Sequence, residues 1–191
     1  MNASGKRALV FLAAGLAWAA AAQERAIDPQ KSAMTVRVYK AGVFSAFGHD
    51  HEIAAPIARG AVDAATRRVE LRVEAAALRV RDAKSSDKDR GEIQKTMVGP
   101  DVLDVEHYPE ISFRSTTVEA AGPDSWKVHG SLTLHGQTQQ VTVNVKEENG
   151  HYVGSAALNQ TSFGIKPVAV AGGTIKVKNE IRIEFDIQLV R

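Results

Sequence analysis

Alternation of apolar and polar residues with a period of two is the dominant pattern along the chain. Between residues 181 and 189, isoleucine, phenylalanine or leucine stands at every odd position, and a charged or amide residue stands at every even one. The same alternation runs through residues 34–39, 69–74, 126–134 and 141–145. Successive side chains of a strand point to opposite faces, so each run predicts a strand with one buried and one hydrated face, as in antiparallel sheets.

Short turn sequences separate these runs. They occur at residues 63–66 (Asp-Ala-Ala-Thr), 121–124 (Ala-Gly-Pro-Asp), 135–138 (His-Gly-Gln-Thr) and 148–150 (Glu-Asn-Gly). Glycine, proline, asparagine and aspartate favour the backbone conformations of tight turns. Strands joined by such short connections predict a meander of hairpins, which forms a barrel or a two-sheet sandwich.

One stretch departs from the strand pattern and predicts a helix. Ser85 or Ser86 can cap its first turn, and Asp87 and Asp89 place negative charge there, where the helix dipole favours it. The helix is expected to run to about Val98, because a Gly-Pro pair follows directly.

Strands that are apolar on one face need something to cover that face. A single helix of about a dozen residues is too small for a whole meander, so either a second sheet packs against the first or the sheet closes on itself. Closure also removes unpaired strand edges. The expected fold class is all-β: an extended antiparallel barrel of about eight strands with a short helical insertion. The pattern alone leaves open whether side chains fill the interior or a ligand occupies it.

The first 22 residues are typical of a secretory signal peptide. Lys6 and Arg7 precede a short apolar run, residues 8–19, and three alanines follow at 20–22. A membrane-spanning helix needs about 20 apolar residues, more than this run offers. We therefore expect an exported protein with a signal peptide at residues 1–22 and one barrel domain at residues 23–191. Loss of the two cations brings the formal charge of +2 to about zero.

Composition excludes several classes of protein. The chain has no cysteine, so it has no disulfide, thiolate metal site, cysteine nucleophile or lipid-modified cysteine. The sequence has no stripe of lysine and arginine interleaved with aromatic residues, so we expect no nucleic-acid partner. The chain also lacks a Gly-x-Ser-x-Gly elbow, a His-Glu-x-x-His motif and a glycine-rich phosphate loop. We therefore expect that the protein is not an enzyme and that it has no catalytic residues and no cofactor.

Two histidines stand close together in the chain. On a strand, His49 and His51 project to the same face, because they are two residues apart. Three interpretations remain open: a hydrated pair at the rim, a polar contact with a ligand's head group at the barrel mouth, or part of a metal site. Two imidazoles suit zinc, copper or nickel, but a third ligand has to come from elsewhere in the fold. The spacing alone assigns no metal.

Aromatic residues supply the other candidates for a lumen or its mouth. Phe44 and Phe47 lie in a segment flanked by glycines and are candidates for an aromatic lip, as is Phe163 in a Ser-Phe-Gly-Ile loop. Ordinary core packing is the alternative for these three. The remaining candidates occupy apolar faces of predicted strands and are expected to point inward, either lining or filling the barrel: Phe113, Trp126 and Phe185.

Three segments resemble the YceI-like family. Residues 99–118, which contain Asp-Val-Glu-His-Tyr-Pro-Glu-Ile-Ser-Phe, resemble its central motif after a short helix. Residues 130–143 are similar to its following hairpin, and Ser-Phe-Gly-Ile at 162–165 is similar to the loop before its last strand. These segments occur in the family's order, and the resemblance covers nearly the whole chain after residue 22.

The resemblance implies a lipocalin-like barrel in the bacterial periplasm. It implies a hollow lumen that holds a long amphiphile, either a polyisoprenoid or a fatty-acid derivative, and no catalytic residues. The chain departs from the family's commonest pattern at residues 44–53, Phe-Ser-Ala-Phe-Gly-His-Asp-His-Glu-Ile, which leaves the identity of the ligand open. Transient contact with a membrane surface and formation of a homodimer also remain open. Two alternatives stand beside a carrier: a metal-binding protein using His49 and His51, and a ligand-free structural protein associated with stress.

Overall fold

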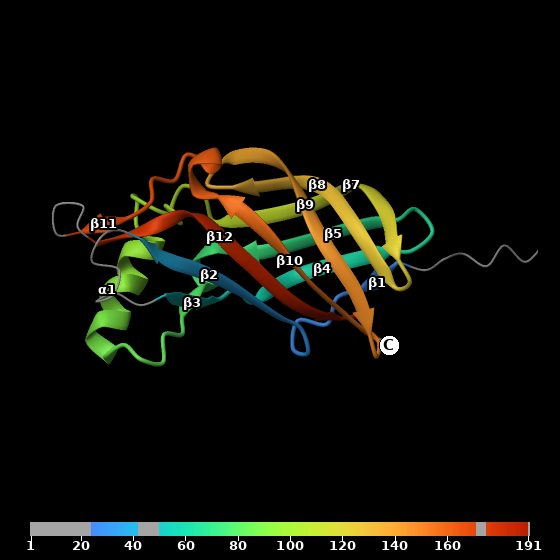
Figure 1. Cartoon of the computed structure of the whole chain (residues 1–191), viewed down its shortest axis with the longest axis horizontal. Helices are drawn as coiled ribbons and strands as arrows, with labels where there is room; N and C mark the ends of the chain where they lie inside the picture. The colour runs from blue at the N-terminus through green and yellow to red at the C-terminus, as the bar shows by residue number, and fades with distance from the viewer. Residues whose placement is uncertain (1–23, 42–49, 171–174, 191) are drawn as a thin grey trace, which may run out of the picture.

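A single antiparallel sheet curls into an elongated barrel, with one helix at one end (Figure 1). The computed structural model describes residues 24–41, 50–170 and 175–190, and the expected signal peptide lies outside them. The strands are β1 Arg25–Ala26, β2 Ala33–Ala41, β3 His51–Ala54, β4 Ile57–Asp63, β5 Arg68–Glu74, β6 Arg79–Val80, β7 Glu110–Gly122, β8 Ser125–Leu134, β9 Gln137–Glu148, β10 His151–Asn159, β11 Ala169–Val170 and β12 Ile175–Gln188. Their order in the sheet is β1-β4-β5-β7-β8-β9-β10-β12-β2-β3-β6, and β11 pairs with β12.

The predicted all-β barrel is confirmed, although the number of strands differs from the expected eight. The described part of the chain forms twelve strands, of which eight have seven residues or more. The excess consists of the short strands β1, β3, β6 and β11, which alternation over two to four residues does not reveal. The eight long strands form the barrel wall.

Hydrogen bonds close the sheet by joining the β1 end to the C-terminal end of β12. Strands β3 and β4 follow each other across Ala55 and Pro56; β3 pairs with β2, and β4 pairs with β5. The Ala55 amide donates to the Met34 carbonyl of β2 at 2.9 Å, which continues the β3 pairing to the bend. The segment after β1 bridges β4 and β12, because the Ile27 amide donates to Gly60 O at 2.8 Å and Ile27 pairs with Leu189. The pairing therefore runs around the barrel.

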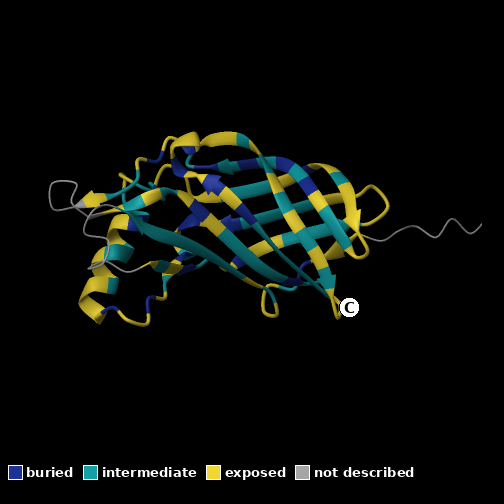
Figure 2. Cartoon of the chain, viewed as in Figure 1, coloured by how far each residue is buried: buried dark blue, intermediate teal, exposed yellow. Residues whose placement is uncertain are grey.

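The strands have the predicted two-sided character. Buried and more exposed residues alternate along the strands (Figure 2). In β8, Val128, Gly130, Leu132 and Leu134 are buried, and the residues that alternate with them are more exposed. The connection from β9 to β10 is a two-residue turn in which Asn149 and Gly150 have positive φ angles of 56° and 83°. Such turns match the twist of paired strands and favour asparagine and glycine at these positions.

The predicted helix is α1, Asp87–Val98. Ser86 caps it, with the side-chain oxygen accepting a hydrogen bond from the Asp89 amide at 3.1 Å. Met97, in its last turn, is buried in the core at this end of the barrel. Within the described residues, no helix is long and apolar enough to cross a membrane.

Candidate functional site

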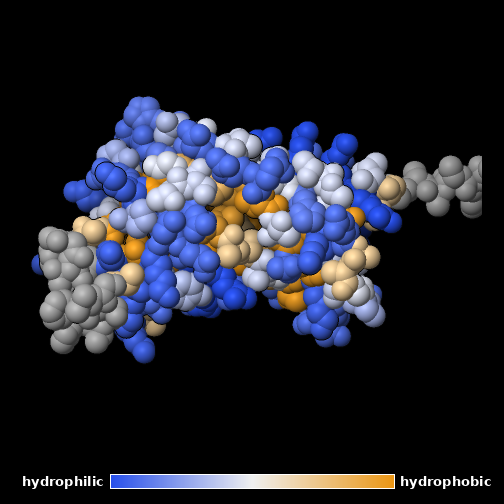
Figure 3. All heavy atoms as spheres, turned by 45° about the horizontal axis from the view of Figure 1, so that its top comes forward, coloured by the Kyte–Doolittle hydropathy of each residue, from blue (hydrophilic) through white to orange (hydrophobic). Residues whose placement is uncertain are grey.

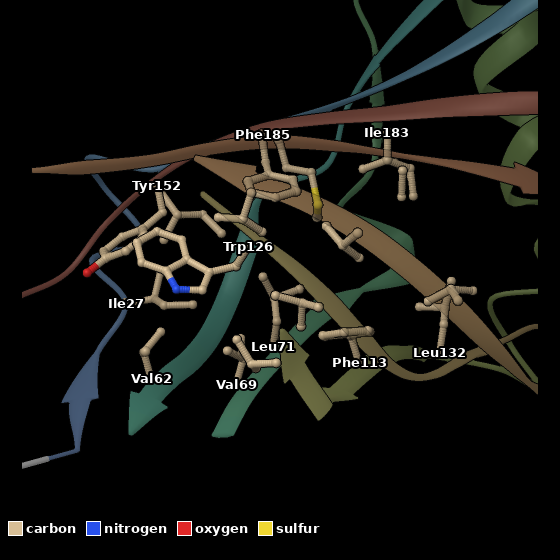
Figure 4. A pocket seen from close by; sticks show the side chains of 18 of the residues that line it. Ile27, Val62, Val69, Leu71, Phe113, Trp126, Leu132, Tyr152, Ile183 and Phe185 are labelled. Carbon is tan, nitrogen blue, oxygen red and sulfur yellow. The ribbon is translucent and has the colours of Figure 1, made fainter. Parts of the chain in front are cut away.

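A cavity of about 420 Å³ occupies the half of the barrel nearest β1. All eight long strands contribute side chains to its wall, which is almost entirely aliphatic and aromatic (Figure 4). Among the described residues, the ionisable groups of the wall are Asp63, Arg67 and Tyr152. Small-molecule sites typically measure about 300–1,000 Å³ and combine apolar walls with a few polar groups. The dimensions and lining of the cavity are therefore those of a ligand site.

A second cavity of about 110 Å³ adjoins the first on the side towards α1. Met97 and Leu103 contribute to its wall. Six apolar residues belong to both walls: Met34, Val73, Ile111, Leu132, Leu158 and Ile183. The two cavities are therefore neighbouring parts of one lumen, separated only by apolar side chains.

The two ends of the lumen differ in how tightly they are packed. We call the part around the larger cavity the hollow half and the part nearest α1 the packed half. The packed half is built around a cluster that includes Ile53, Met97, Leu103, Leu134, Phe163 and Ile165. The hollow half has a smaller buried cluster, Ile27, Ile57 and Ile187. The alternative of a barrel filled throughout does not describe this structure, because the larger cavity occupies one half.

Two glycines provide space for aromatic rings of the hollow half. A Cβ on Gly130 of β8 would lie 2.5 Å from Cζ of Phe113, and a Cβ on Gly154 of β10 would lie 2.5 Å from Cζ of Phe185. Carbon atoms in contact normally lie about 3.5–4.0 Å apart. Each ring therefore packs against the bare backbone of a neighbouring strand, which leaves the centre of the barrel open.

The turn between β4 and β5 carries the charged residues of the wall. Asp63 Oδ1 accepts hydrogen bonds from the amides of Ala65 at 2.9 Å and Thr66 at 3.1 Å. Hydrogen bonds from the side chain and the backbone of Thr66 lower the pKa of Asp63, so this carboxylate is ionised at neutral pH. Arg67 follows in a left-handed conformation with φ 52°.

Strands β9 and β10 pair over only part of their length. β9 pairs with β8 from Gln137 to Lys146, but with β10 only from Asn144 to Glu148. The inward-facing side chains beside this interval include Val141 and Ala156, which line the larger cavity. The cavity is partly open to solvent, and Figure 3 shows a hollow with hydrophobic side chains on the drawn face.

The structure places three of the predicted aromatic residues on the cavity wall: Phe113, Trp126 and Phe185 (Figure 4). Phe163 lies elsewhere. It is 2% exposed in the core of the packed half and lines neither cavity, because the short 3-10 helix Gln160–Phe163 turns it inward. Phe44 and Phe47 lie outside the described residues. Contact of these three wall residues with a ligand stays a prediction.

His51 faces the segment before α1 and does not line either cavity. Its Nδ1 lies 2.6 Å from Oδ2 of Asp82, whose side chain is only 1% exposed. The other carboxylate oxygen of Asp82 accepts a hydrogen bond from the Glu52 amide at 2.7 Å. This arrangement links β3 to the segment before α1. It does not support a head-group contact at the larger cavity.

A metal site centred on the two histidines stays untested, because His49 lies outside the described residues. Within residues 24–41, 50–170 and 175–190, no group of three or more histidine, aspartate or glutamate side chains is arranged to hold a metal ion.

Sequence reasoning missed the polar residues of the wall. Residues 63–66 predict only a turn, so their pattern does not mark Asp63 as a wall residue, and no pattern marks Arg67. Tyr152 shares the inward face of β10 with Ala156 and Leu158, so a period of two through residues 152–158 could have revealed it. No comparable signal exists for the arginine, since it lies in a turn.

Comparisons with known proteins agree with this fold. The family model of the YceI-like domain matches residues 26–189. A UPF0312 protein of Vibrio cholerae is 29% identical over 113 residues, which cover 54% of this chain and 58% of that protein. A UPF0312 protein of Pseudomonas putida is 33% identical over 97 residues, covering 46% and 50%. The chain thus spans about half the length of these curated relatives.

Among solved structures, Burkholderia cenocepacia BcnA has a similar fold. Its crystal structure aligns with a TM-score of 0.62 and 18% identity, covering 86% of this chain and 99% of that one. At this identity the likeness concerns the architecture alone.

Proposed function

Because the chain belongs to the YceI-like family and its barrel encloses an apolar cavity, we propose that it is an exported protein that binds a long-chain amphiphile, a polyisoprenoid or a fatty-acid derivative. The cavity of about 420 Å³, walled by apolar side chains of eight strands, is the observation that carries this proposal. The signal-peptide pattern of residues 1–22 supports a periplasmic location.

The apolar wall supplies enough energy to retain such a ligand. Each buried methylene contributes about 0.8 kcal/mol, so roughly a dozen contribute on the order of 10 kcal/mol before the cost of association. That cost amounts to several kcal/mol, which leaves room for submicromolar binding. The chain of the ligand therefore supplies most of the affinity, and polar contacts at one end add selectivity.

Binding fits the wall better than catalysis does. Nucleophilic or acid–base chemistry needs a nucleophile or a proton-transferring group held by an orienting partner near the reacting atom. The described residues of the larger cavity include no serine, cysteine, histidine or lysine. Asp63 supplies the carboxylate of the wall, and its Oδ1 accepts hydrogen bonds from the amides of its own turn.

Native mass spectrometry of protein purified from the periplasm of its host tests the proposal. The expected result is a population with an added mass that organic extraction removes and identifies as an amphiphile. A ligand-free protein that also takes up neither isoprenoids nor fatty-acid derivatives when they are added would overturn the proposal.

Two neighbouring alanines of β10 offer a matched pair of variants. Ala156 is 8% exposed and faces the larger cavity, whereas Ala157 is exposed on the outer face. Ala156→Phe places a ring in the lumen and is expected to weaken uptake of hexadecanol at least about tenfold, the equivalent of about 1.4 kcal/mol. Ala157→Phe adds the same ring outside and should leave uptake unchanged. Equal uptake by both variants would place the ligand elsewhere.

A further inference from the structure

The polar side chains of the larger cavity lie towards one end of it. Trp126 and Tyr152, whose ring centroids are 6.2 Å apart, lie at the same end as Val62, the neighbour of Asp63 (Figure 4). The opposite end, where the wall is shared with the smaller cavity, is entirely apolar. A bound amphiphile therefore has one favourable orientation, with its head group near the turn between β4 and β5 and its chain directed towards the packed half.

Arg67 is the cation of this wall within the described part of the chain. Its guanidinium carries five N–H donors. Two nearby arginines are engaged differently: Arg59 of β4 and Arg72 of β5 both pair with Glu110. Arg67 makes no hydrogen bond or ion pair with any residue that the structure describes, so its donors are available to a ligand at the mouth.

The nearby carboxylate does not present an equivalent acceptor. Asp63 Oδ1 accepts two amide hydrogen bonds within the turn, and the Thr66 side chain also hydrogen-bonds the carboxylate. A head group that reaches this end of the cavity therefore meets unused donors on Arg67, whereas Oδ1 of Asp63 already accepts the amides of its own turn. This imbalance favours a head group with anionic oxygens over an ammonium group.

Resting on the proposed function, we propose that Arg67 binds the head group of the ligand and that the ligand is an anionic amphiphile, with a carboxylate or phosphate at one end. Guanidinium groups bind the oxygens of both anions in a two-pronged geometry. The Asp63 and Arg67 turn is thus the polar end of the site, and the wall shared by the two cavities receives the far end of the chain.

Three probes with the same hydrocarbon chain separate the head group from the chain: palmitic acid, hexadecyl phosphate and hexadecanol. Calorimetric titration of each into the wild-type protein, Arg67→Gln and Arg68→Gln measures the affinities. Arg68, the first residue of β5, is the matched control, because its substitution removes the same charge one residue away and Arg68 does not line the cavity. Circular dichroism verifies that all three proteins fold.

We expect Arg67→Gln to bind the acid and the phosphate about fivefold more weakly, the size of a charge-assisted contact that solvent partly screens. Its affinity for hexadecanol should equal that of the wild type, and Arg68→Gln should bind all three probes as the wild type does. If all three proteins bound the anions equally, or if both variants lost the same affinity, the role of Arg67 would be overturned. In either case, binding of hexadecanol would still support the proposed function. Failure of every protein to bind any probe would overturn both proposals.

Discussion

The hollow and packed halves of the barrel are built from the same strands, yet the packed half has the larger buried core and the hollow half has the larger cavity. β8 contributes Trp126 to the wall of the larger cavity and Leu134 to the core of the packed half. The difference arises from the connections. Met97 of α1, Leu103 after it and Phe163 of the 3-10 helix insert into one end of the barrel. The strands therefore set the width of the lumen, and the connecting segments determine which part of it is filled.

The largest expected difference between the halves concerns their aromatic residues. Phe163→Ala removes a ring that is 2% exposed and in contact on all sides, so it should lower the free energy of unfolding by about 3–5 kcal/mol. Phe113→Ala should lower it by only about 1–2 kcal/mol, because that ring already borders a cavity and loses fewer contacts. Urea denaturation measures both. Equal losses would contradict the distinction between the halves.

A glycine of the hollow half provides the next test. In Gly130→Ala the new methyl group would meet the Phe113 ring and the Arg114 carbonyl oxygen, each at 2.5 Å. The ring has to move towards the centre of the cavity, so stability should fall by about 1–3 kcal/mol and hexadecanol should bind more weakly. Thermal unfolding and calorimetric titration report the two effects. Unchanged binding with reduced stability would mean that the ring does not define the ligand's space.

Gly91, in the middle of α1, should respond in the opposite direction. A Cβ at this position would meet no atom within 4 Å, and the residue is helical and exposed. Gly91→Ala should raise the free energy of unfolding by about 0.5–1 kcal/mol, because alanine loses less backbone entropy in a helix. Urea denaturation measures the gain. A loss of stability would contradict this expectation, and altered hexadecanol binding would show that the helix is coupled to the hollow half.

The smallest effect concerns a charge in the connection after α1. A hydrogen bond to Asp104 raises the pKa of His107 above its usual value of 6.5. The stabilisation by this pair is fully present below pH 6.5 and is lost as the pH rises through the elevated pKa of the folded state. NMR titration should show an elevated pKa in the wild type and a value near 6.5 in Asp104→Asn. An unchanged pKa in the variant would assign the shift to another group.

Much of the architecture follows from local patterns. Alternation predicts five of the eight long strands, β2, β5, β8, β9 and β12. The residue types of Asn149 and Gly150 predict their turn, and Ser86 together with the later Gly-Pro pair bounds α1. Local patterns do not show how the barrel closes, because closure depends on the two-residue strand β1 and on Ile27, which pairs with Leu189.

The contents of the barrel were harder to predict, because alternation is identical in strands that line a cavity and strands that fill one. Val143 and Leu134 both face inward, and only the connections inserted near Leu134 make the difference. The contact between Phe113 and Gly130 depends on strand register, and Arg67 reaches the cavity from a turn. Neither contact can be predicted from the sequence, because both depend on how segments far apart in the chain are arranged in the fold.

The location of a bound chain tests the central claim most directly. Palmitic acid carrying a bromine on its terminal carbon can be crystallised with the protein, and the anomalous signal of bromine then reports where the chain ends. We expect the bromine in the lumen beside Leu132, Leu158 and Ile183, with the carboxylate near Arg67. A bromine peak only on the outer surface, with the larger cavity free of ligand density, would contradict the account.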